Sequence, residues 1–318
     1  MTSLSNLIKE IKAAKQRISA HVIRTELMES EFLSEQVGCR VLLKLENFQH
    51  TGSFKARGAL NKLLSLNDEQ RLRGITAAST GNHALAVAHA MKVTDTAGTL
   101  YMPTTAARAK VDKLKAAGVD IQQIGEDPLE SELKARCVAK EENRVYVSPY
   151  NDLQVMAGQG TIAYEILEQE AAVDTMIVSV GGGGLIGGMA AGAKQLKSDV
   201  RAVGVVPANS PAMYDAVKAG HIVESILKPT LSDGTAGRLE NGAITVGPCT
   251  EFVDQWIQIK EEDIAAAMEL ISQEHGMQVE GAAGVAVAGF LQLAGSFSRE
   301  AVVAVVICGG NVASSKSA

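Results

Sequence analysis

The sequence has few of the features that identify a metal, redox, membrane or nucleic-acid-binding protein. Its four cysteines are scattered through 318 residues, with no CxxC spacing and no paired histidine, which disfavours a metal cluster or a disulfide framework. A formal net charge of −6 without a basic run argues against a nucleic-acid partner. No stretch approaches the roughly 18 uncharged apolar residues that a membrane span needs. We therefore expect a cytoplasmic protein whose partners include neither membrane nor nucleic acid.

What the chain does have is a regular alternation of strand and helix patterns. Its 46% hydrophobic residues are enough to bury a large core, in two domains or in one large α/β unit. Helical patterns lie between most of the strand patterns, and the charged N-terminal stretch predicts an amphipathic helix rather than a signal peptide. Strict alternation predicts an α/β fold of parallel sheets covered by helices on both faces. Strands are predicted at residues 41–46, 74–79, 98–102, 119–124, 144–148, 175–180, 201–206 and 301–308.

The middle of the chain predicts a domain of its own. Residues 70–149 contain a compact run of strand–helix units, typical of a second sheet inserted into a larger one. One of its predicted helices, at 105–118, places Val111 and Leu114 on one face and ends at Gly118. We expect a small domain at 70–149 and a large domain made of 1–69 and 150–318.

Four consecutive glycines, Gly181 to Gly184, follow the predicted strand 175–180 and precede a helix. Each glycine costs about 1 kcal/mol of backbone entropy relative to alanine. That cost is offset if bare backbone N–H groups wrap an anion at the positive end of a helix. The structural alternative is a tight turn that allows close helix packing.

The residues after this loop narrow the choice of anion. Gly182, Gly184 and Gly187 satisfy GxGxxG, but a dinucleotide site also needs an acidic residue at the end of the next strand. That strand ends at Val206, and no carboxylate is there. No GxxxxGK[ST] motif occurs, which excludes a P-loop. A lone phosphate monoester fits the loop better.

A second polar helix start lies in "AASTGNHALAVAHAM". Small polar residues follow a strand that ends at Ala78, and a helix begins near His83. Hydroxyls and free N–H groups at a helix start suit a small carboxylate, although an ordinary N-cap explains them equally well.

The stretch "FQHTGSFKARG" sets a single lysine, Lys55, at the mouth of a predicted helix. The positive end of a helix repels an ammonium group. Lys55 is therefore either an ordinary surface charge or a residue meant to be neutral or covalently occupied.

Five motifs occur in the order "TGSFKARG", "STGNHA", "AGQGTIAYEI", the tetraglycine loop and "CGGN". Together they resemble the threonine/serine dehydratase family of fold type II enzymes, which use pyridoxal phosphate. The resemblance spans residues from about 20 to the end and implies two open, twisted, mostly parallel sheets. The family includes serine racemase, hydroxyaspartate dehydratases and the dehydratase of hydroxyectoine utilisation. The stretch "TLSDGTAGRLENGAIT" resembles the last of these most.

The resemblance implies roles for individual residues. Lys55 would form a Schiff base with the cofactor aldehyde and later remove the α-proton, and a helix start helps keep its amine neutral. Asn82 would bind the ring hydroxyl and Phe54 would pack against the ring. The residues implied to bind the phosphate are Gly181, Gly182, Gly183, Gly184 and Leu185. Those implied to line the substrate site are Ser79, Thr80, Gly81, Asn82, His83, Gln159 and Gly160.

Cys308 bears on the type of reaction, because the resemblance implies that it faces the pyridine nitrogen. A thiol is a weak donor and is uncharged at neutral pH, so the ring remains a moderate electron sink. A moderate sink suffices for β-elimination and disfavours transamination. The structural alternative is a small buried residue at a strand end.

Three departures from the family pattern carry information. Val206 and Ala212 stand where serine racemase-like members have carboxylates for a divalent cation, so we expect no metal there. Thr80 stands where racemases use a serine as an acid, so a hydroxyl remains and racemisation is less expected but not excluded. The chain ends seven residues after Asn311, so a regulatory domain with isoleucine feedback is not expected.

The sequence leaves four functions to compare. The first is a lyase that dehydrates a β-hydroxy-α-amino acid to a 2-oxo acid and ammonia, and the second is a racemase of such amino acids. A nicotinamide oxidoreductase is disfavoured by Val206, and a pure binding protein gives Lys55 no purpose. Arg57, Arg238 and His50 could meet an acidic substrate group, but surface or structural pairing is favoured. Relatives are usually homodimers or homotetramers.

Overall fold

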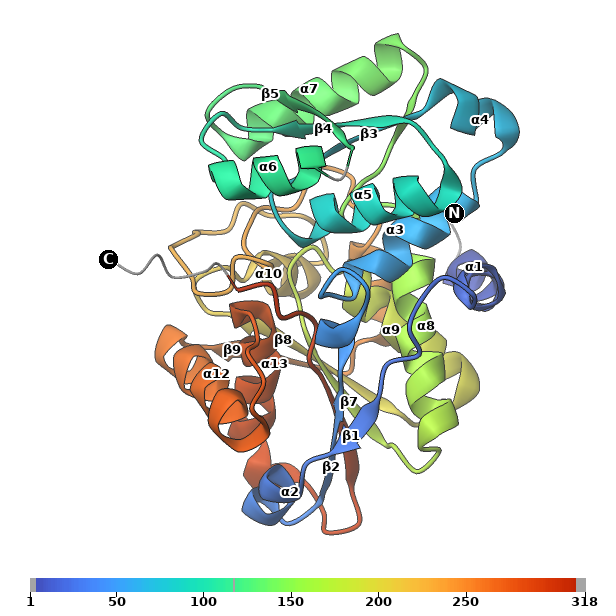
Figure 1. Ribbon diagram of the computed structural model, residues 1–318. Coiled ribbons are helices and arrows are strands. Elements are labelled where there is room, and N and C mark those ends of the chain that lie inside the picture. Colours follow the sequence, from blue (N-terminus) through green and yellow to red (C-terminus); the bar gives the residue numbers. More distant parts are fainter. Residues whose placement is uncertain (1–3, 117, 313–318) are drawn as a thin grey trace.

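The chain forms two β-sheets in the computed structural model, which describes residues 4–116 and 118–312 (Figure 1). The strands are β1 (Leu27–Glu29), β2 (Arg40–Lys44), β3 (Ile75–Ala78), β4 (Gly98–Met102), β5 (Asp120–Gln123), β6 (Val145–Tyr146), β7 (Thr175–Ser179), β8 (Arg201–Pro207), β9 (Gln255–Ile259) and β10 (Val302–Val306). The large sheet has the order β1-β2-β10-β7-β8-β9 and the small sheet β5-β4-β3-β6. All pairs are parallel except β1 with β2. This confirms the predicted fold class.

The helices fill the connections between parallel strands. They are α1 (Leu4–Ile18), α2 (Glu31–Val37), α3 (Lys55–Leu64), α4 (Asp68–Arg73), α5 (Asn82–Thr94), α6 (Arg108–Ala116), α7 (Pro128–Glu141), α8 (Leu153–Gln169), α9 (Gly184–Leu196), α10 (Ala212–Ala219), α11 (Val246–Phe252), α12 (Glu261–His275) and α13 (Gly281–Gln292). The predicted N-terminal amphipathic helix is α1, whose apolar positions Leu7, Ile11 and Ala14 are buried. Among the described helices, none has the length and apolarity that crossing a membrane requires.

Every predicted strand is present, but two strands were not predicted. β1 has only three residues and pairs antiparallel at the edge of the large sheet. β9 has a mixed polar and apolar sequence, Gln255–Ile259, because it lies at the opposite edge and buries only part of its surface. Short edge strands have a weaker hydrophobic pattern than the central strands β7 and β10, whose residues are all buried.

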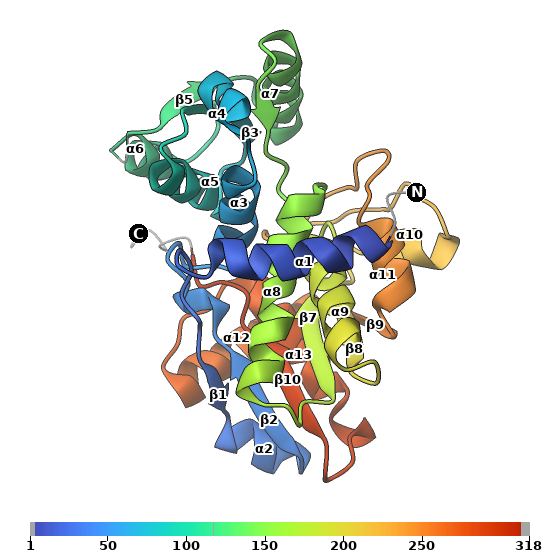
Figure 2. The ribbon, with the colours of Figure 1, turned by 90° about the vertical axis from the view of Figure 1, so that its right-hand side faces the viewer.

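The large sheet is covered on both faces, which explains the apolar sequences of its central strands. Figure 1 shows α12 and α13 on one side of this sheet and α8 and α9 on the other. Figure 2 shows α8, α9 and α1 from that second side, in front of the strands. The central strands, α13 and α9 contribute to one large hydrophobic cluster. The carboxyl ends of β7 and β10 point toward the small sheet.

The small sheet has a hydrophobic cluster of its own. Figure 1 shows α7 on one side of this sheet and α5 and α6 on the other. Val111 and Leu114 of α6 are buried in the cluster, and Gly118 has the left-handed φ of +80° that a helix-ending glycine adopts. Ala59, Leu60 and Leu63 of α3 also belong to this cluster. Helix α3 therefore packs on the small sheet although it begins beside the large one.

The two hydrophobic clusters support a division of the chain into two domains. We propose the boundaries predicted from the sequence, with a small domain at 70–149 and a large domain made of 1–69 and 150–318. Helix α3, with side chains in the small-sheet cluster, is the element that both domains share in this proposal.

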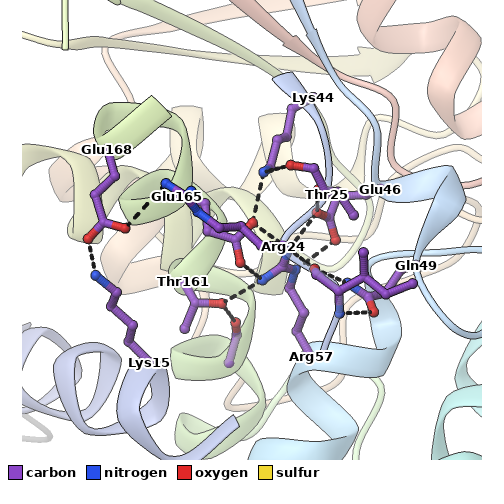
Figure 3. A network of polar contacts seen from close by, with 12 residues as sticks. Lys15, Arg24, Thr25, Lys44, Glu46, Gln49, Arg57, Thr161, Glu165 and Glu168 are labelled. Carbon is purple, nitrogen blue, oxygen red and sulfur yellow. Dashed lines mark hydrogen bonds and ion pairs between the residues drawn. The ribbon is translucent and has the colours of Figure 1, made fainter. Parts of the chain in front are cut away.

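A buried cluster of charged residues fixes the start of α3 (Figure 3). The guanidinium of Arg57 pairs with Glu46 at 2.7 Å and with Glu165 at 2.6 Å, and Lys44 pairs with Glu165 at 2.8 Å. Arg57, Lys44 and Glu46 have no exposed side-chain surface. Burial alone would lower the pKa of Arg57, but the two carboxylates raise it overall. The cluster joins the end of β2, the first turn of α3 and α8.

Thr25 and Thr161 complete this cluster. The hydroxyl of Thr25 donates to Glu46 at 2.6 Å, and Arg57 donates to the hydroxyl of Thr161 at 3.3 Å. Two cations and two anions cancel in charge, and their remaining hydrogen-bonding groups are used. Arg57 is therefore a structural residue, as the favoured interpretation held, and cannot meet a substrate.

We expect that Arg57→Met destabilises the fold by about 3–5 kcal/mol, because it leaves two buried carboxylates without their main cation. The free energy of unfolding in urea measures this. Arg238→Met is the matched control, because Arg238 and its partner Glu224 are mostly exposed, and it should change stability by less than about 0.5 kcal/mol. Equal effects of the two substitutions would contradict the assignment.

Candidate active site

A cavity of about 600 Å³ lies between the two sheets, at the carboxyl ends of their strands. Ser79, Ser179 and Cys308, which line it, close or follow β3, β7 and β10. Carboxyl ends of parallel strands are the usual place of a binding site in open α/β sheets. The cavity brings together the predicted site residues except Gln159 and Gly160: Phe54, Lys55, Ser79, Thr80, Gly81, Asn82, His83, Gly181, Gly182, Gly183, Gly184, Leu185 and Cys308.

Lys55 is the first residue of α3, and its amine lies inside the cavity. Its Nζ donates to the carbonyl oxygen of Pro149 at 2.7 Å and lies 5.2 Å from the ring centroid of Phe54. The backbone before it is tied to the end of the large sheet, because Phe54 N–H donates to the carbonyl of Cys308 at 3.0 Å. A bridge between Ser53 and Gly309 extends this pairing. The position of the lysine is thus set by the large sheet.

The environment of Lys55 favours a neutral amine. Burial lowers its pKa to about 8, although Glu280 and Cys308 act in the opposite direction. At pH 7 roughly one amine in ten is then unprotonated, compared with fewer than about one in a thousand for a free lysine. The question that the sequence raised is answered: Lys55 is no surface charge, and its amine is available as a nucleophile or base.

The glycine loop forms the opposite wall. Gly183 has a left-handed φ of +81°, and a Cβ on Gly182 would lie 2.4 Å from the ring of Tyr150. In the part of the chain that the structure describes, no backbone carbonyl accepts from the N–H groups of Gly181, Gly182 or Gly183. Free N–H groups at the start of α9 can bind an anion. A side chain at Gly182 would collide with the ring of Tyr150, and one at Gly181 with the backbone of Thr235.

The polar start of α5 forms a third wall. Ser79 accepts from the N–H of Gly81 at 3.2 Å, and Asn82 begins the helix. The ring of His83 is buried and bonded to the carbonyl of Val147 at 2.9 Å. Burial, together with the charge of Lys55, lowers the pKa of His83 to about 3. His83 is therefore neutral at pH 7, and hydroxyls and N–H groups would have to bind a carboxylate here.

Cys308 lies at the inner end of the cavity, just after β10. Its sulfur accepts from the hydroxyl of Ser179 at 3.5 Å, and only 1% of the residue is exposed. Burial, reinforced by Glu280, raises the pKa of the thiol. Cys308 is therefore uncharged at neutral pH, as the sequence analysis assumed.

The cavity also contains residues that the sequence analysis did not identify. Glu280 lies at the start of α13, and both of its carboxylate oxygens accept from Asn82 Nδ2. Tyr150 packs against the glycine loop, and its hydroxyl accepts from the N–H of Glu240 at 3.0 Å. Lys110, Asp233 and Met268 lie around the remaining surface. The only local signal for Glu280 is an acidic residue placed before a run of small helical residues, which does not distinguish it from an ordinary helix start.

The expectation that Gln159 and Gly160 line the cavity is corrected by the structure. Gln159 is buried between α8 and α3, where its side-chain oxygen accepts from the N–H of Gly58 at 3.1 Å. A Cβ on Gly160 would lie 2.7 Å from the carbonyl of Gly188, in the contact of α8 with α9. The "AGQG" motif therefore packs helices together behind Lys55.

The other two candidate substrate contacts also lie elsewhere. Arg238 pairs with Glu224 at 2.6 Å on the surface, and the ring of His50 stacks on that of His89 with centroids 5.1 Å apart. Neither residue lines the cavity.

A family profile and a similar protein both indicate the enzyme family to which the chain belongs. A family profile described as "Pyridoxal-phosphate dependent enzyme" matches residues 18–309. The L-threonine ammonia-lyase of Thermotoga maritima is 38% identical over 305 residues, which cover 96% of this chain and 75% of that protein.

Solved structures with the same fold include both a deaminase and a racemase. The processed form of threonine deaminase isoform 2 from Solanum lycopersicum aligns with a TM-score of 0.93 and 31% identity, covering 98% of this chain and 86% of that one. Maize serine racemase aligns with a TM-score of 0.91 and 32% identity, covering 96% of this chain and 94% of that one.

The lowered pKa of Lys55 can be measured directly in the protein without any ligand. We expect the rate at which an acylating reagent modifies Lys55, followed by mass spectrometry of its peptide, to reach half its maximum near pH 8, because only the neutral amine reacts. The same peptide in the denatured chain should reach half its maximum near pH 10.4. A midpoint in the folded protein equal to that of the denatured chain would contradict the burial argument.

Proposed function

The chain belongs to the family of pyridoxal-phosphate dependent enzymes and, within it, to the threonine/serine dehydratase family of fold type II. From this membership we propose that it eliminates water from a β-hydroxy-α-amino acid. The products would be a 2-oxo acid and ammonia. The family assigns pyridoxal 5'-phosphate as the cofactor. This cofactor replaces the dinucleotide considered from the sequence. A dinucleotide site needs an acidic residue at the end of the strand, where Val206 stands.

The residues of the cavity fit this cofactor. The free N–H groups of the glycine loop suit its phosphate, and a Cβ on Gly182 would collide with the ring of Tyr150 that packs against this loop. The amine of Lys55 suits its aldehyde. Asn82 and Phe54 are proposed to bind the ring, with Cys308 at its nitrogen.

When bound, pyridoxal phosphate supplies a sink for the electron pair left by removal of the α-proton. In the proposed mechanism Nζ of Lys55 holds the cofactor and, once released, takes that proton. The carbonyl of Pro149 orients the amine by accepting its hydrogen bond at 2.7 Å. Because the pKa of Lys55 is about 8, its amine can both accept and return a proton near neutral pH.

Two further features support elimination. The start of α5, from Ser79 to His83, offers hydroxyl and N–H groups to the substrate carboxylate, and His83 beside them is neutral at pH 7. Cys308 is neutral and a weak donor, so it does not hold a proton on the ring nitrogen. This suits a reaction in which the leaving hydroxyl removes the electron pair at once.

The observation that carries this proposal is the amine of Lys55, which lies in the same cavity as backbone N–H groups of the glycine loop that no backbone carbonyl of the described residues accepts from. A pure binding protein does not require a buried lysine, whose charged form is costly.

Racemisation is the second candidate function. The hydroxyl-bearing side chain of Thr80 lines the cavity on the α5 side, and maize serine racemase is 32% identical to this chain. A hydroxyl there could return a proton to the α-carbon from the face opposite Lys55. The added methyl group of threonine and the neutral Cys308 favour elimination.

The segment 230–245, "TLSDGTAGRLENGAIT", supports a more specific substrate. Leu231, Asp233, Gly234, Thr235 and Ala236 of this segment line the cavity. We propose it as the determinant of side-chain specificity, with a hydroxyectoine-derived β-hydroxy amino acid among the substrates. A homodimer or homotetramer in the cytoplasm is proposed from the family resemblance alone.

A substrate panel tests the reaction and its alternative together. We expect 2-oxo acid to form from at least one of threonine, serine, 3-hydroxyaspartate and hydroxylated diaminobutyrate, and Lys55→Ala to lower the rate at least 1,000-fold. Chromatography of the D and L forms is run on the same samples. Racemisation faster than 2-oxo acid release would overturn elimination as the main activity.

A further inference from the structure

The side chain of Asn82 is held from across the cavity by two residues of the large-sheet side. Its Nδ2 donates to the two carboxylate oxygens of Glu280 at 2.9 and 2.7 Å. Its Oδ1 accepts from Nδ2 of Asn311 at 2.8 Å. Asn82 begins α5, which packs on the small sheet, whereas Glu280 begins α13 and Asn311 follows β10. These contacts therefore join the two halves of the molecule at the cavity.

The chemistry of the two partners fixes the orientation of the Asn82 amide. An amide can be turned by 180° without a change of shape, which exchanges its donor and its acceptor. A carboxylate accepts and cannot donate, so the nitrogen of Asn82 must face Glu280 and the oxygen must face Asn311. The nitrogen has two hydrogens, and one shared hydrogen can serve both carboxylate oxygens. Sharing of this kind would leave the second N–H for a ligand in the cavity.

We propose that Glu280 is a positioning residue that acts through Asn82: it fixes the Asn82 amide with its donor toward the cavity and latches the start of α5 to the large-sheet side. The orienting part rests on the proposed function, in which Asn82 binds the ring hydroxyl of the cofactor. The latch part does not depend on any ligand.

The local backbone is built to hold the Glu280 carboxylate in this place. The N–H of Glu280 donates to the carbonyl of Gly309 at 3.1 Å, which fixes the residue to the end of the large sheet. A Cβ on Gly309 would lie 2.5 Å from Glu280 Oε1, so only a glycine leaves room for the carboxylate. The charges that face this group are Lys55, which favours its ionised form, and Asp233, which opposes it.

The pKa of Glu280 depends on the groups around its carboxylate. Burial raises its pKa, whereas the hydrogen bond from Asn82 and the charge of Lys55 lower it. The bond from Asn82 therefore helps to keep the carboxylate ionised, and the ionised carboxylate keeps Asn82 in its orientation. The ionised state of Glu280 and the orientation of the Asn82 amide therefore stabilise each other.

Hydrogen exchange in the protein without cofactor tests the latch. In Glu280→Ala we expect the amides of residues 86–90, whose helical bonds reach the first turn of α5, to exchange about 5- to 10-fold faster. Glu280→Gln keeps an acceptor and should restore most of the protection. Glu274→Gln, an exposed change on α12, is the control and should leave α5 unchanged. Unchanged exchange in Glu280→Ala would overturn the latch.

Cofactor affinity in a double-mutant cycle tests the orienting role. Glu280→Ala and Asn82→Ala should each weaken binding of pyridoxal phosphate by about 3- to 10-fold, the effect of one lost hydrogen bond. Because Glu280 acts through Asn82, the double variant should bind no more weakly than Asn82→Ala alone. Additive losses would overturn the orienting role, since Glu280 would then act on the cofactor independently.

The two measurements separate this inference from the proposed function. If the unaltered protein binds no pyridoxal phosphate, the proposed function fails, and the exchange experiment still decides whether the latch exists. If the cofactor binds and Lys55→Ala abolishes turnover while the cycle is additive, the proposed function stands and the orienting role is wrong.

Discussion

A lysine amine held in a buried cavity is the constraint on which the rest of this structure depends. An ammonium group loses its water when it is buried, and the positive end of α3 adds to that penalty, so the neutral form of Lys55 gains relative to the charged one. The charge of Glu280 acts against this loss and keeps the amine from becoming wholly neutral. The balance leaves a group that can take a proton and give it back near neutral pH, as acid–base work requires.

Much of the surrounding fold serves to keep that amine in one place. The Arg57 cluster ties the first turn of α3 to β2 and α8, and the bond from Gly58 to Gln159 repeats the tie one residue later. Backbone bonds from Phe54 to Cys308 connect the other side of Lys55 to the end of β10. The Arg57 cluster and the Gly58–Gln159 bond lie outside the cavity, whereas Phe54 and Cys308 line it. The cluster and the bond give Arg57 and Gly58, which do not line the cavity, a structural role beside the lysine in the motif "TGSFKARG".

Local patterns in the sequence were sufficient for the parts of the molecule that local physics determines. The central strands are continuous apolar runs because both faces of the sheet are buried, and the loop from Gly181 to Gly184 marks where a strand meets a helix. Local patterns do not identify Glu280, because its partner Asn82 lies 198 residues away in the sequence. Gln159 was misplaced for the opposite reason, since a motif identifies a helix near the site and not the side of the helix that faces it.

The proposed function requires that the amine of Lys55 forms the covalent bond with the cofactor. The protein saturated with pyridoxal phosphate can be reduced with borohydride, which makes the bond between amine and aldehyde permanent, then digested and mapped by mass spectrometry. The account predicts that the added mass lies on the peptide containing Lys55 and that no other lysine is labelled in comparable yield. Label on a different lysine, or a Lys55 peptide that stays unmodified, would contradict it.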